Sequence, residues 1–306
     1  MTLVLGLAPE QPADSAVHLA ALLARSAGEP LLVAVVLPRP WFPGPAKVDA
    51  EYRGEMHEAA EAALTRARES MPVDVEATFL VHDARSAPTG LLELVEEHAA
   101  SMVVLGSSSA GVFGHIALGS VTDRLLHSSP VPVALAPRGY RCGPDTRVGR
   151  VTAAYGGSGE ADDLVLAAAS VAARIGATLR IASFAVWSRP AYTTRLGSDG
   201  EDPVLAQWVA ELEGSAHTLL AEVEDLARPP GTVEAVIGHG RSWAESIEDV
   251  GWQAGDVLVI GSSGLGPVSR VFLGSRAAKI LRHSPVPVVL VPKARAEDLA
   301  HEAAAD

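Results

Sequence analysis

The chain has 306 residues, of which 48% are hydrophobic and 20% charged, and a formal net charge of −13. This composition is typical of globular domains with apolar cores, and the length suggests two of them. The excess of acid disfavours nucleic acid as a partner, because a phosphate backbone needs a basic surface. The single cysteine, Cys142, excludes an internal disulfide framework and cysteine-rich zinc sites, and it fits a reducing cytoplasm.

Targeting and metal-binding signals are missing from the sequence. The stretch MTLVLGLAPEQ has no basic region and too short an apolar run for a signal peptide. No stretch approaches the roughly 18 unbroken apolar residues of a membrane span. The histidines are scattered without a His-x-x-x-His pair, so no metal site is predicted. We expect a soluble, cytoplasmic protein with no membrane partner.

The first half alternates between strand and helix patterns. Continuous apolar runs such as LLVAVVL are typical of strands that are buried on both faces of a parallel sheet. Strands are predicted over residues 2–8, 31–37, 74–81, 101–105 and 132–136. Helices are predicted over residues 13–27, 47–70, 88–99 and 118–128. Alternating strands and helices predict right-handed crossovers and an open, doubly wound α/β sheet.

The second half repeats the first. Residues 106–137 align without gaps on residues 261–292, with 15 identities in 32 positions. Strands are predicted over residues 149–155, 178–186, 232–237, 256–260 and 287–291. Helices are predicted over residues 160–176, 202–227, 241–250 and 273–283, followed by a frayed tail from 297 to 306. The repeat predicts two domains, 1–139 and 147–306, joined by a linker rich in glycine, proline and charge (138–149).

The last predicted strand of each half contains a proline, Pro132 or Pro287. Because proline donates no ladder hydrogen bond, this strand is expected at a sheet edge. Two equivalent apolar edges within one chain would cover each other across a pseudo-twofold axis. We therefore predict two tandem, Rossmann-like, five-stranded domains that form an internal pseudo-dimer.

A glycine- and serine-rich loop, GSSGLG, begins at Gly261 between a predicted strand and a predicted helix. This arrangement suits an anion, since free backbone N–H groups and the helix dipole both favour negative charge. Residues 257–296 contain six basic residues and no acid, which would attract a polyanion. The alternative is that the loop only makes a turn. It is neither a P-loop nor the dinucleotide Gly-x-Gly-x-x-Gly motif.

The spacing Gly261-x-x-Gly264, then nine residues, then Gly274-Ser275, followed by HSPVPVVLVP, resembles the ATP-binding signature of the universal stress protein family. The resemblance covers nearly the whole chain as two tandem domains. It implies a five-stranded parallel sheet, dimers through the last strand, and a role in stress or dormancy responses. It also implies ATP, usually with a divalent ion such as magnesium, held by these glycines and Ser275. Further nucleotide contacts are expected from Ser262, Ser263 and Arg276.

The first half departs from this signature. Ser109 replaces the second motif glycine in Gly106-x-x-Ser109, although Gly119 and Ser120 are kept, and Asp123 offsets Arg124. Family members that bind ATP usually carry an aspartate after the first strand. Here the corresponding positions hold Ala8 and Tyr155, and Tyr155 is expected to stack on a ligand, to bond to it, or only to pack. We expect the nucleotide mainly in the second half, with Gly106, Gly119 and Ser120 as a degenerate counterpart.

Two other functions remain open from the sequence. One is a nucleotide-free interaction module of the same fold, with a protein partner or a second copy of the chain. The other is slow ATP hydrolysis, which ranks last because no general base is positioned by the sequence. Among single residues, Ser86 and Ser242 are expected to cap helices. Trp41 and Trp187 follow the second strands and either wall a pocket or pack.

Overall fold

The computed structural model describes residues 1–10, 13–39, 46–157, 159–187, 201–262 and 274–305. The elements of the first half are β1 (Thr2–Leu7), α1 (Asp14–Ala27), β2 (Leu31–Pro38), α2 (Ala46–Ser70), β3 (Ala77–Ala84), α3 (Ala87–Glu97), β4 (Ala100–Gly106), α4 (Ser120–Ser128) and β5 (Val133–Ala136). The elements of the second half are β6 (Arg150–Ala154), α5 (Gly159–Ile175), β7 (Thr178–Val186), α6 (Glu201–Glu224), β8 (Val233–Gly240), α7 (Trp243–Asp249), β9 (Asp256–Gly261), α8 (Ser275–His283), β10 (Val288–Val291) and α9 (Lys293–Ala305).

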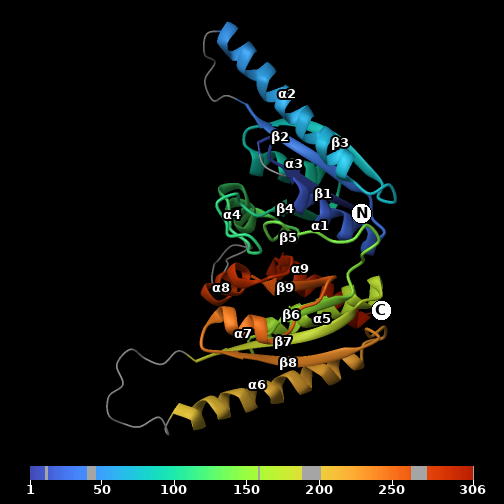
Figure 1. Cartoon of the computed structure of the whole chain (residues 1–306). Helices are drawn as coiled ribbons and strands as arrows, with labels where there is room; N and C mark the ends of the chain where they lie inside the picture. The colour runs from blue at the N-terminus through green and yellow to red at the C-terminus, as the bar shows by residue number, and fades with distance from the viewer. Residues whose placement is uncertain (11–12, 40–45, 158, 188–200, 263–273, 306) are drawn as a thin grey trace, which may run out of the picture.

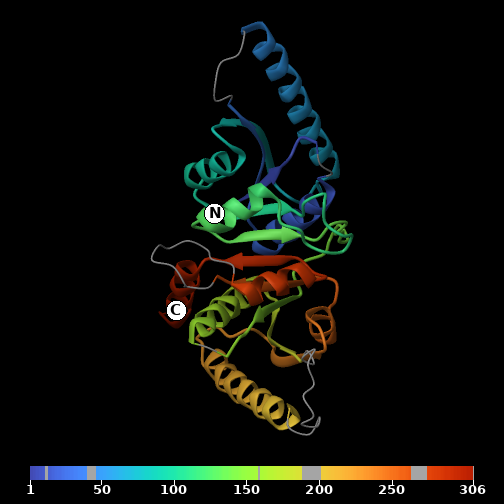
Figure 2. The ribbon, with the colours of Figure 1, turned by 90° about the vertical axis from the view of Figure 1, so that its left-hand side faces the viewer.

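The strands of both halves form one ten-stranded sheet in the order β3-β2-β1-β4-β5-β10-β9-β6-β7-β8. Pairing is parallel within each half, and β5 meets β10 antiparallel, with Val289 opposite Ala134. These two strands lie side by side at the middle of the molecule in both views (Figure 1, Figure 2). The predicted α/β fold of two doubly wound, five-stranded units that pair through their last strands is confirmed.

The two prolines stand immediately before these central strands rather than within them. β5 begins at Val133 and β10 at Val288. The carbonyl oxygens of Pro132 and Pro287 accept hydrogen bonds from neighbouring strands at 3.0 and 2.9 Å. Each proline thus accepts a hydrogen bond through its carbonyl oxygen. Because it stands just before the strand, its missing N–H leaves no gap in the hydrogen bonds between the strands.

Helices cover both faces of the sheet and bury two apolar layers. One layer packs under α1, α2, α5, α6 and α9, and the other under α3, α4, α7 and α8. The strands read as continuous apolar runs because both of their faces are covered, as predicted. No helix among the described residues is both long and apolar enough to cross a membrane.

Two predicted segments are wrong. β3 begins at Ala77 and not at residue 74, because Pro72 to Val75 form a turn in which the Val75 N–H donates to the Pro72 carbonyl at 3.2 Å. The tail is not frayed, since it forms α9, which packs along α5. Its buried residues recur at helical spacing: Ala296, Leu299, Ala300 and Ala303.

The linker of residues 138–149 is held along α1, much as α9 is held along α5. The Gly139 N–H donates to the Ser15 hydroxyl at 3.0 Å, and the Val148 N–H donates to Ser26 at 2.8 Å. Between them, the Cys142 thiol donates to the His18 carbonyl at 3.5 Å. The segment between the halves is therefore bonded to the first helix along its length. The domain boundaries at 139 and 147 stay a prediction.

Candidate functional site

Two cavities of similar size lie at corresponding places in the two halves. One has a volume of about 460 Å³ and lies at the carboxyl ends of β1 and β4. The other has a volume of about 470 Å³ and lies at the carboxyl ends of β6 and β9. In each half the strand order reverses between these two strands, which is where doubly wound sheets bind their ligands.

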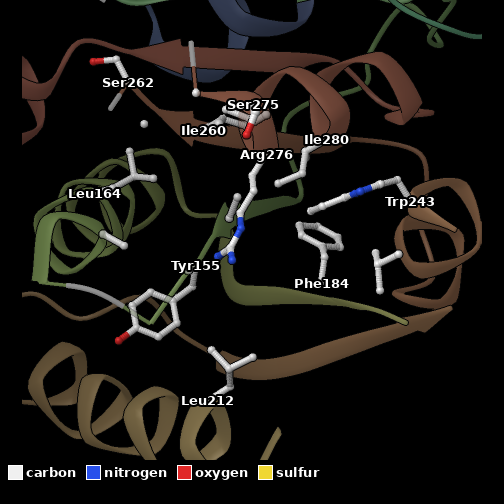
Figure 3. Close-up of a pocket in the computed structure, with 17 residues that line it drawn as sticks. Tyr155, Leu164, Phe184, Leu212, Trp243, Ile260, Ser262, Ser275, Arg276 and Ile280 are labelled. Carbon is white, nitrogen blue, oxygen red and sulfur yellow. The ribbon is translucent and has the colours of Figure 1, made fainter. Parts of the chain in front are cut away.

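The second-half cavity is lined by the ends of two strands and by the start of α8 (Figure 3). Gly274 and Ser275 begin this helix and line the cavity, as the sequence predicted for the site. Gly274 carries no side chain that could cap the first N–H groups of α8, and among the described residues no acceptor is bonded to the N–H groups of residues 275–277. The described first turn contains no acidic residue, which leaves the positive end of the helix dipole uncompensated.

Arg276 adds a full positive charge to this cavity. It is the second residue of α8, and its side chain points into the cavity toward Tyr155 (Figure 3). The guanidinium group offers several N–H donors in a planar fork, a geometry suited to a phosphate or a carboxylate. Arg276, which the sequence predicted only as a further contact, is thus the only charged side chain among the described residues that line this cavity.

Gly261 and Ser262 line the cavity from the end of β9, but part of their expected bonding capacity is used within the chain. The Ser262 N–H donates to the Val291 carbonyl at 3.0 Å, so it is not available to a phosphate. The Ser262 hydroxyl accepts from the Lys293 N–H at 3.0 Å, which leaves its own hydrogen to donate. A Cβ at Gly261 would make only ordinary contacts with Leu164, at 3.4 Å and beyond. The described neighbours therefore do not require a glycine at this position.

Tyr155 lies directly after β6 and is 7% exposed. It lines the cavity, between Asp162 on α5 and Ser215 on α6. Burial raises the pKa of Tyr155, and the nearby negative charge of Asp162 adds to the rise. The Tyr155 ring is a wall of the cavity that a ligand would meet (Figure 3).

Two aromatic walls of the cavity were not predicted. Phe184 comes from β7 and Trp243 from the start of α7, and both line the cavity (Figure 3). The Lys279 ammonium lies 5.6 Å from the centre of the Trp243 ring. A usable signal was present in the sequence, since Trp243 directly follows the predicted N-cap Ser242 and must therefore begin a helix at the end of β8.

Several predicted residues have other places. Ser263, Gly264 and Trp41 lie outside the described residues. Trp187 is 39% exposed and does not line the cavity, and its ring centre is 6.0 Å from that of His239. The predicted helix caps are confirmed. The Ser86 hydroxyl accepts from the Thr89 N–H, and the Ser242 hydroxyl accepts from the Glu245 N–H.

The first-half cavity contains Gly106, Gly119 and Ser120 in places that correspond to the second-half motif. Ser109, which replaces the second motif glycine, is exposed and does not line the cavity, so its side chain does not block the cavity. None of the described residues that line this cavity is charged. The first turn of α4 carries Asp123, which offsets the positive end of the helix.

The backbone N–H groups of the loop after β4 are bonded within the first half. The Ser107 N–H donates to the Ala136 carbonyl at 3.0 Å, and the Ser108 N–H donates to the Ala117 carbonyl at 2.9 Å. The Ala117 N–H donates in turn to the Ser107 hydroxyl at 2.9 Å. A phosphate would have to break these bonds to reach the same donors. The loop residues are therefore arranged as a self-bonded turn.

Comparisons with known proteins place the sequence within one group. A model of the universal stress protein family matches residues 1–137 and again residues 148–292. Universal stress proteins of Mycobacterium tuberculosis and Mycobacterium bovis are each 37% identical to this chain over 296 residues, which is 95% of this chain and 100% of theirs.

Solved structures give the same architecture. A universal stress protein from Archaeoglobus fulgidus matches with a TM-score of 0.58 at 22% identity, over 95% of this chain and 98% of its own. A putative universal stress protein from Pseudomonas aeruginosa matches with a TM-score of 0.56 at 16% identity, over 99% and 97%. At these identities the likeness concerns the fold alone.

Proposed function

Because the chain belongs to the universal stress protein family, we propose that it binds an adenine nucleotide, ATP in particular, in the cavity of its second half. Occupancy of this cavity would regulate a response to stress or dormancy. The observation that carries the proposal is Arg276, whose side chain enters the cavity beside the start of α8. The second half thereby combines a cation with a helix dipole at one place.

The phosphates of the nucleotide would lie against α8. The N–H groups of its first turn, the Ser275 hydroxyl and the Arg276 guanidinium are donors to phosphate oxygens. The Ser262 hydroxyl keeps one hydrogen to donate from the opposite side. None of the described residues that line the cavity carries a carboxylate, so a magnesium ion would be held through phosphate oxygens and water.

The adenine ring would lie against the aromatic part of the cavity. Tyr155, Phe184 and Trp243 face it from β6, β7 and α7 (Figure 3). A flat heterocycle gains both apolar burial and offset stacking against such rings. The volume of about 470 Å³ is within the range of small-molecule sites.

The second candidate, a nucleotide-free interaction module with a protein partner or a second copy of the chain, is favoured by one observation. The Ser262 N–H is bonded to the Val291 carbonyl. This group would be free in a site built only for a ligand. If this alternative holds, the cavity results from the reversal of strand order in the sheet and has no ligand.

Nucleotide retention separates the two functions. The protein is purified gently, and any released nucleotide is identified by mass spectrometry, alongside a thermal shift with added ATP. Gly274→Asp places a carboxylate at the start of α8 and should abolish both signals by repulsion. Because aspartate is a preferred N-cap residue, this variant should remain folded.

Gly119→Asp is the matched control, since Gly119 begins α4 as Gly274 begins α8. It should leave ATP binding unchanged. An adenine nucleotide in the wild type and in Gly119→Asp, but not in Gly274→Asp, supports the proposal. An empty wild type with no thermal shift at millimolar ATP overturns it in favour of the interaction module.

A further inference from the structure

We propose that the first-half cavity is a separate binding site for an uncharged, mainly aliphatic small molecule with one hydroxyl or carbonyl group. This inference concerns a different cavity from the proposed nucleotide site and does not rest on it. It starts from the contrast between two cavities of nearly equal volume at corresponding places in the fold.

The walls of the first-half cavity are aliphatic. The described residues that line it include neither a charged nor an aromatic side chain. The larger apolar side chains that line it are Leu7, Val36, Met56, Leu91, Leu105 and Val121. Aliphatic walls favour a ligand by apolar burial rather than by ring stacking, and a flexible methionine adapts to its shape.

The polar groups of this cavity gather on one side. Ser107 and Ser108 follow β4, and Ser120 and Thr122 lie at the start of α4. The Ser107 hydroxyl already bonds to the Ala117 N–H and the Ser108 carbonyl, so a neutral polar group on the ligand would meet the hydroxyls of the other three residues, which can both donate and accept. One apolar body and one hydrogen-bonding end are the features that fix a ligand's orientation in such a cavity.

A phosphorylated ligand does not fit this chemistry. The N–H groups of Ser107 and Ser108 are bonded to backbone carbonyls, and no described lining residue supplies a positive charge. Asp123 adds a negative charge to the first turn of α4. An anion would be stabilised only by the uncapped start of α4, which Asp123 offsets, whereas a neutral ligand loses little hydration on binding.

Methionine-methyl NMR tests the proposal on the full chain. The probe is 1-octanol, with ¹³C-methyl methionine labels. Met56 lines the cavity, whereas Met71 packs against the core beneath α1 and α2 and serves as an internal control. Octanol should shift the Met56 signal in a saturable way and leave Met71 unchanged. Along the series from 1-butanol to 1-octanol, each methylene should raise the affinity about fourfold. Octanoate should bind at least about tenfold more weakly than octanol.

Two matched variants assign the site. Ala8 and Gly156 are exposed, follow the first strand of their halves and line the respective cavities. Ala8→Trp should remove the octanol response and leave any ATP response intact, while Gly156→Trp should leave the octanol response intact. Ser120→Trp, also at an exposed lining residue, replaces Ala8→Trp if that variant does not fold.

Three results would overturn the proposal. The first is a lack of a saturable Met56 shift with any of the alcohols. The second is an octanol response that survives Ala8→Trp and Ser120→Trp. The third is tighter binding of octanoate or ATP than of octanol at Met56, which would make the cavity an anion site. None of these results depends on whether the second half binds a nucleotide.

Discussion

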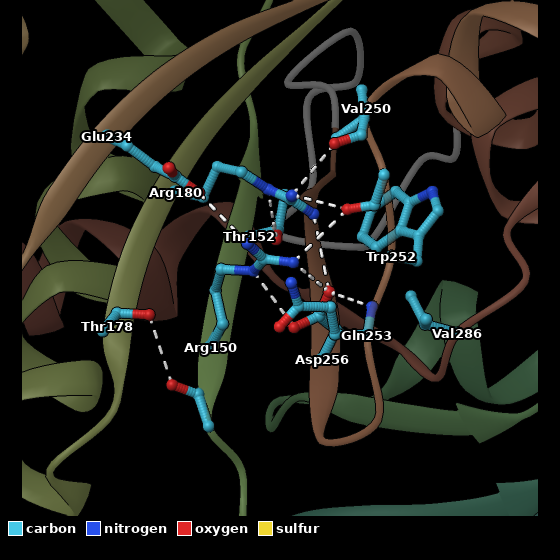
Figure 4. A network of polar contacts seen from close by, with 12 residues as sticks. Arg150, Thr152, Thr178, Arg180, Glu234, Val250, Trp252, Gln253, Asp256 and Val286 are labelled. Carbon is cyan, nitrogen blue, oxygen red and sulfur yellow. Dashed lines mark hydrogen bonds and ion pairs between the residues drawn. The ribbon is translucent and has the colours of Figure 1, made fainter.

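The two halves of the molecule share a strand order but differ at both ends of their strands. At the amino ends, the second half carries a buried charged network around Asp256 whose aligned positions in the first half hold uncharged residues (Figure 4). Arg150 donates to both carboxylate oxygens of Asp256, at 3.1 and 2.6 Å. In the repeat alignment, the first half has Thr2 and Ser101 at these two positions.

A second arginine completes this network. Arg180 is 2% exposed and donates to the carbonyls of Val250 and Gly251, at 3.1 and 2.8 Å (Figure 4). Its guanidinium carbon lies 4.8 Å from the centre of the Trp252 ring. Burial and the charge of Arg150 lower the pKa of Arg180. The corresponding residue of the first half is Leu32, whose apolar side chain is buried in the core.

The apolar strands therefore fix the shared fold, while the strand ends are free to diverge. Both charged and apolar side chains fit the amino end of the same sheet. At the carboxyl ends, a cation and aromatic rings in one half correspond to aliphatic walls in the other. Matched substitutions in the two halves measure how much each difference affects stability or binding.

The largest effect is expected from Asp256→Ala. This substitution leaves Arg150 and the buried Arg180 without their shared counterion, and loss of one partner of a buried pair costs about 3–5 kcal/mol. The free energy of unfolding, from urea denaturation, measures the loss. Ser101→Ala is the control and should cost about 1 kcal/mol or less, since it removes one hydrogen bond to Glu29. Equal losses would refute the asymmetry.

A smaller effect is expected from α9, which has no counterpart among the described residues of the first half. Leu299→Ala removes a side chain that is 9% exposed, and we expect a loss of about 2 kcal/mol in the free energy of unfolding. The exposed Glu302 lies on the same helix, and Glu302→Ala should change stability by less than about 0.5 kcal/mol. If Leu299→Ala changes stability as little as Glu302→Ala does, α9 is not part of the folded core.

The helix caps are a feature that the halves share, so they should respond alike. Ser86→Ala and Ser242→Ala each remove a side-chain acceptor for an N–H in the first turn of a helix. Each should lower the free energy of unfolding by about 1 kcal/mol. Thermal denaturation of both single variants and the double variant checks this. A double variant that departs from the sum would indicate coupling between the halves.

The smallest effect concerns pH and the first half only. Asp74 accepts two hydrogen bonds from Arg25, at 2.5 and 3.0 Å, and this bonding lowers the pKa of Asp74. A lowered carboxyl pKa stabilises the fold above the unfolded pKa of about 4, and this contribution is lost as the pH falls through the folded value. Asp74→Asn should therefore be slightly less stable than wild type at pH 7, with the gap closing in acid. A gap that is constant from pH 7 to pH 3 would contradict this.

Much of the fold followed from the sequence, because apolar runs, prolines and the repeat all act locally. The join between β5 and β10 followed from Pro132 and Pro287, from the apolar strands that follow them, and from the family resemblance. α9 was missed although its buried alanines and Leu299 recur at helical spacing, because the end of a chain is usually poorly ordered. β3 was displaced because Val73 and Val75 continue its apolar pattern through a turn.

The candidate site was predicted less completely. Gly274 and Ser275 were found from spacing, since they begin the helix that follows a strand. Phe184 and Trp243 were not found, because they come from different elements and meet only when the sheet forms. The hydrogen bonds that occupy the Ser262 and Ser107 N–H groups also depend on tertiary contacts, with β10 and β5.

Isothermal titration calorimetry gives the number of ATP molecules bound per chain. This number tests directly whether the nucleotide site is confined to the second half. Arg276 corresponds to Val121 in the repeat, so Arg276→Val and Val121→Arg are reciprocal variants. We expect one ATP per chain in the wild type, about 10- to 100-fold weaker binding in Arg276→Val, and one ATP per chain in Val121→Arg. Two ATP molecules per wild-type chain, or an affinity unaffected by Arg276→Val, would contradict a nucleotide site confined to the second half.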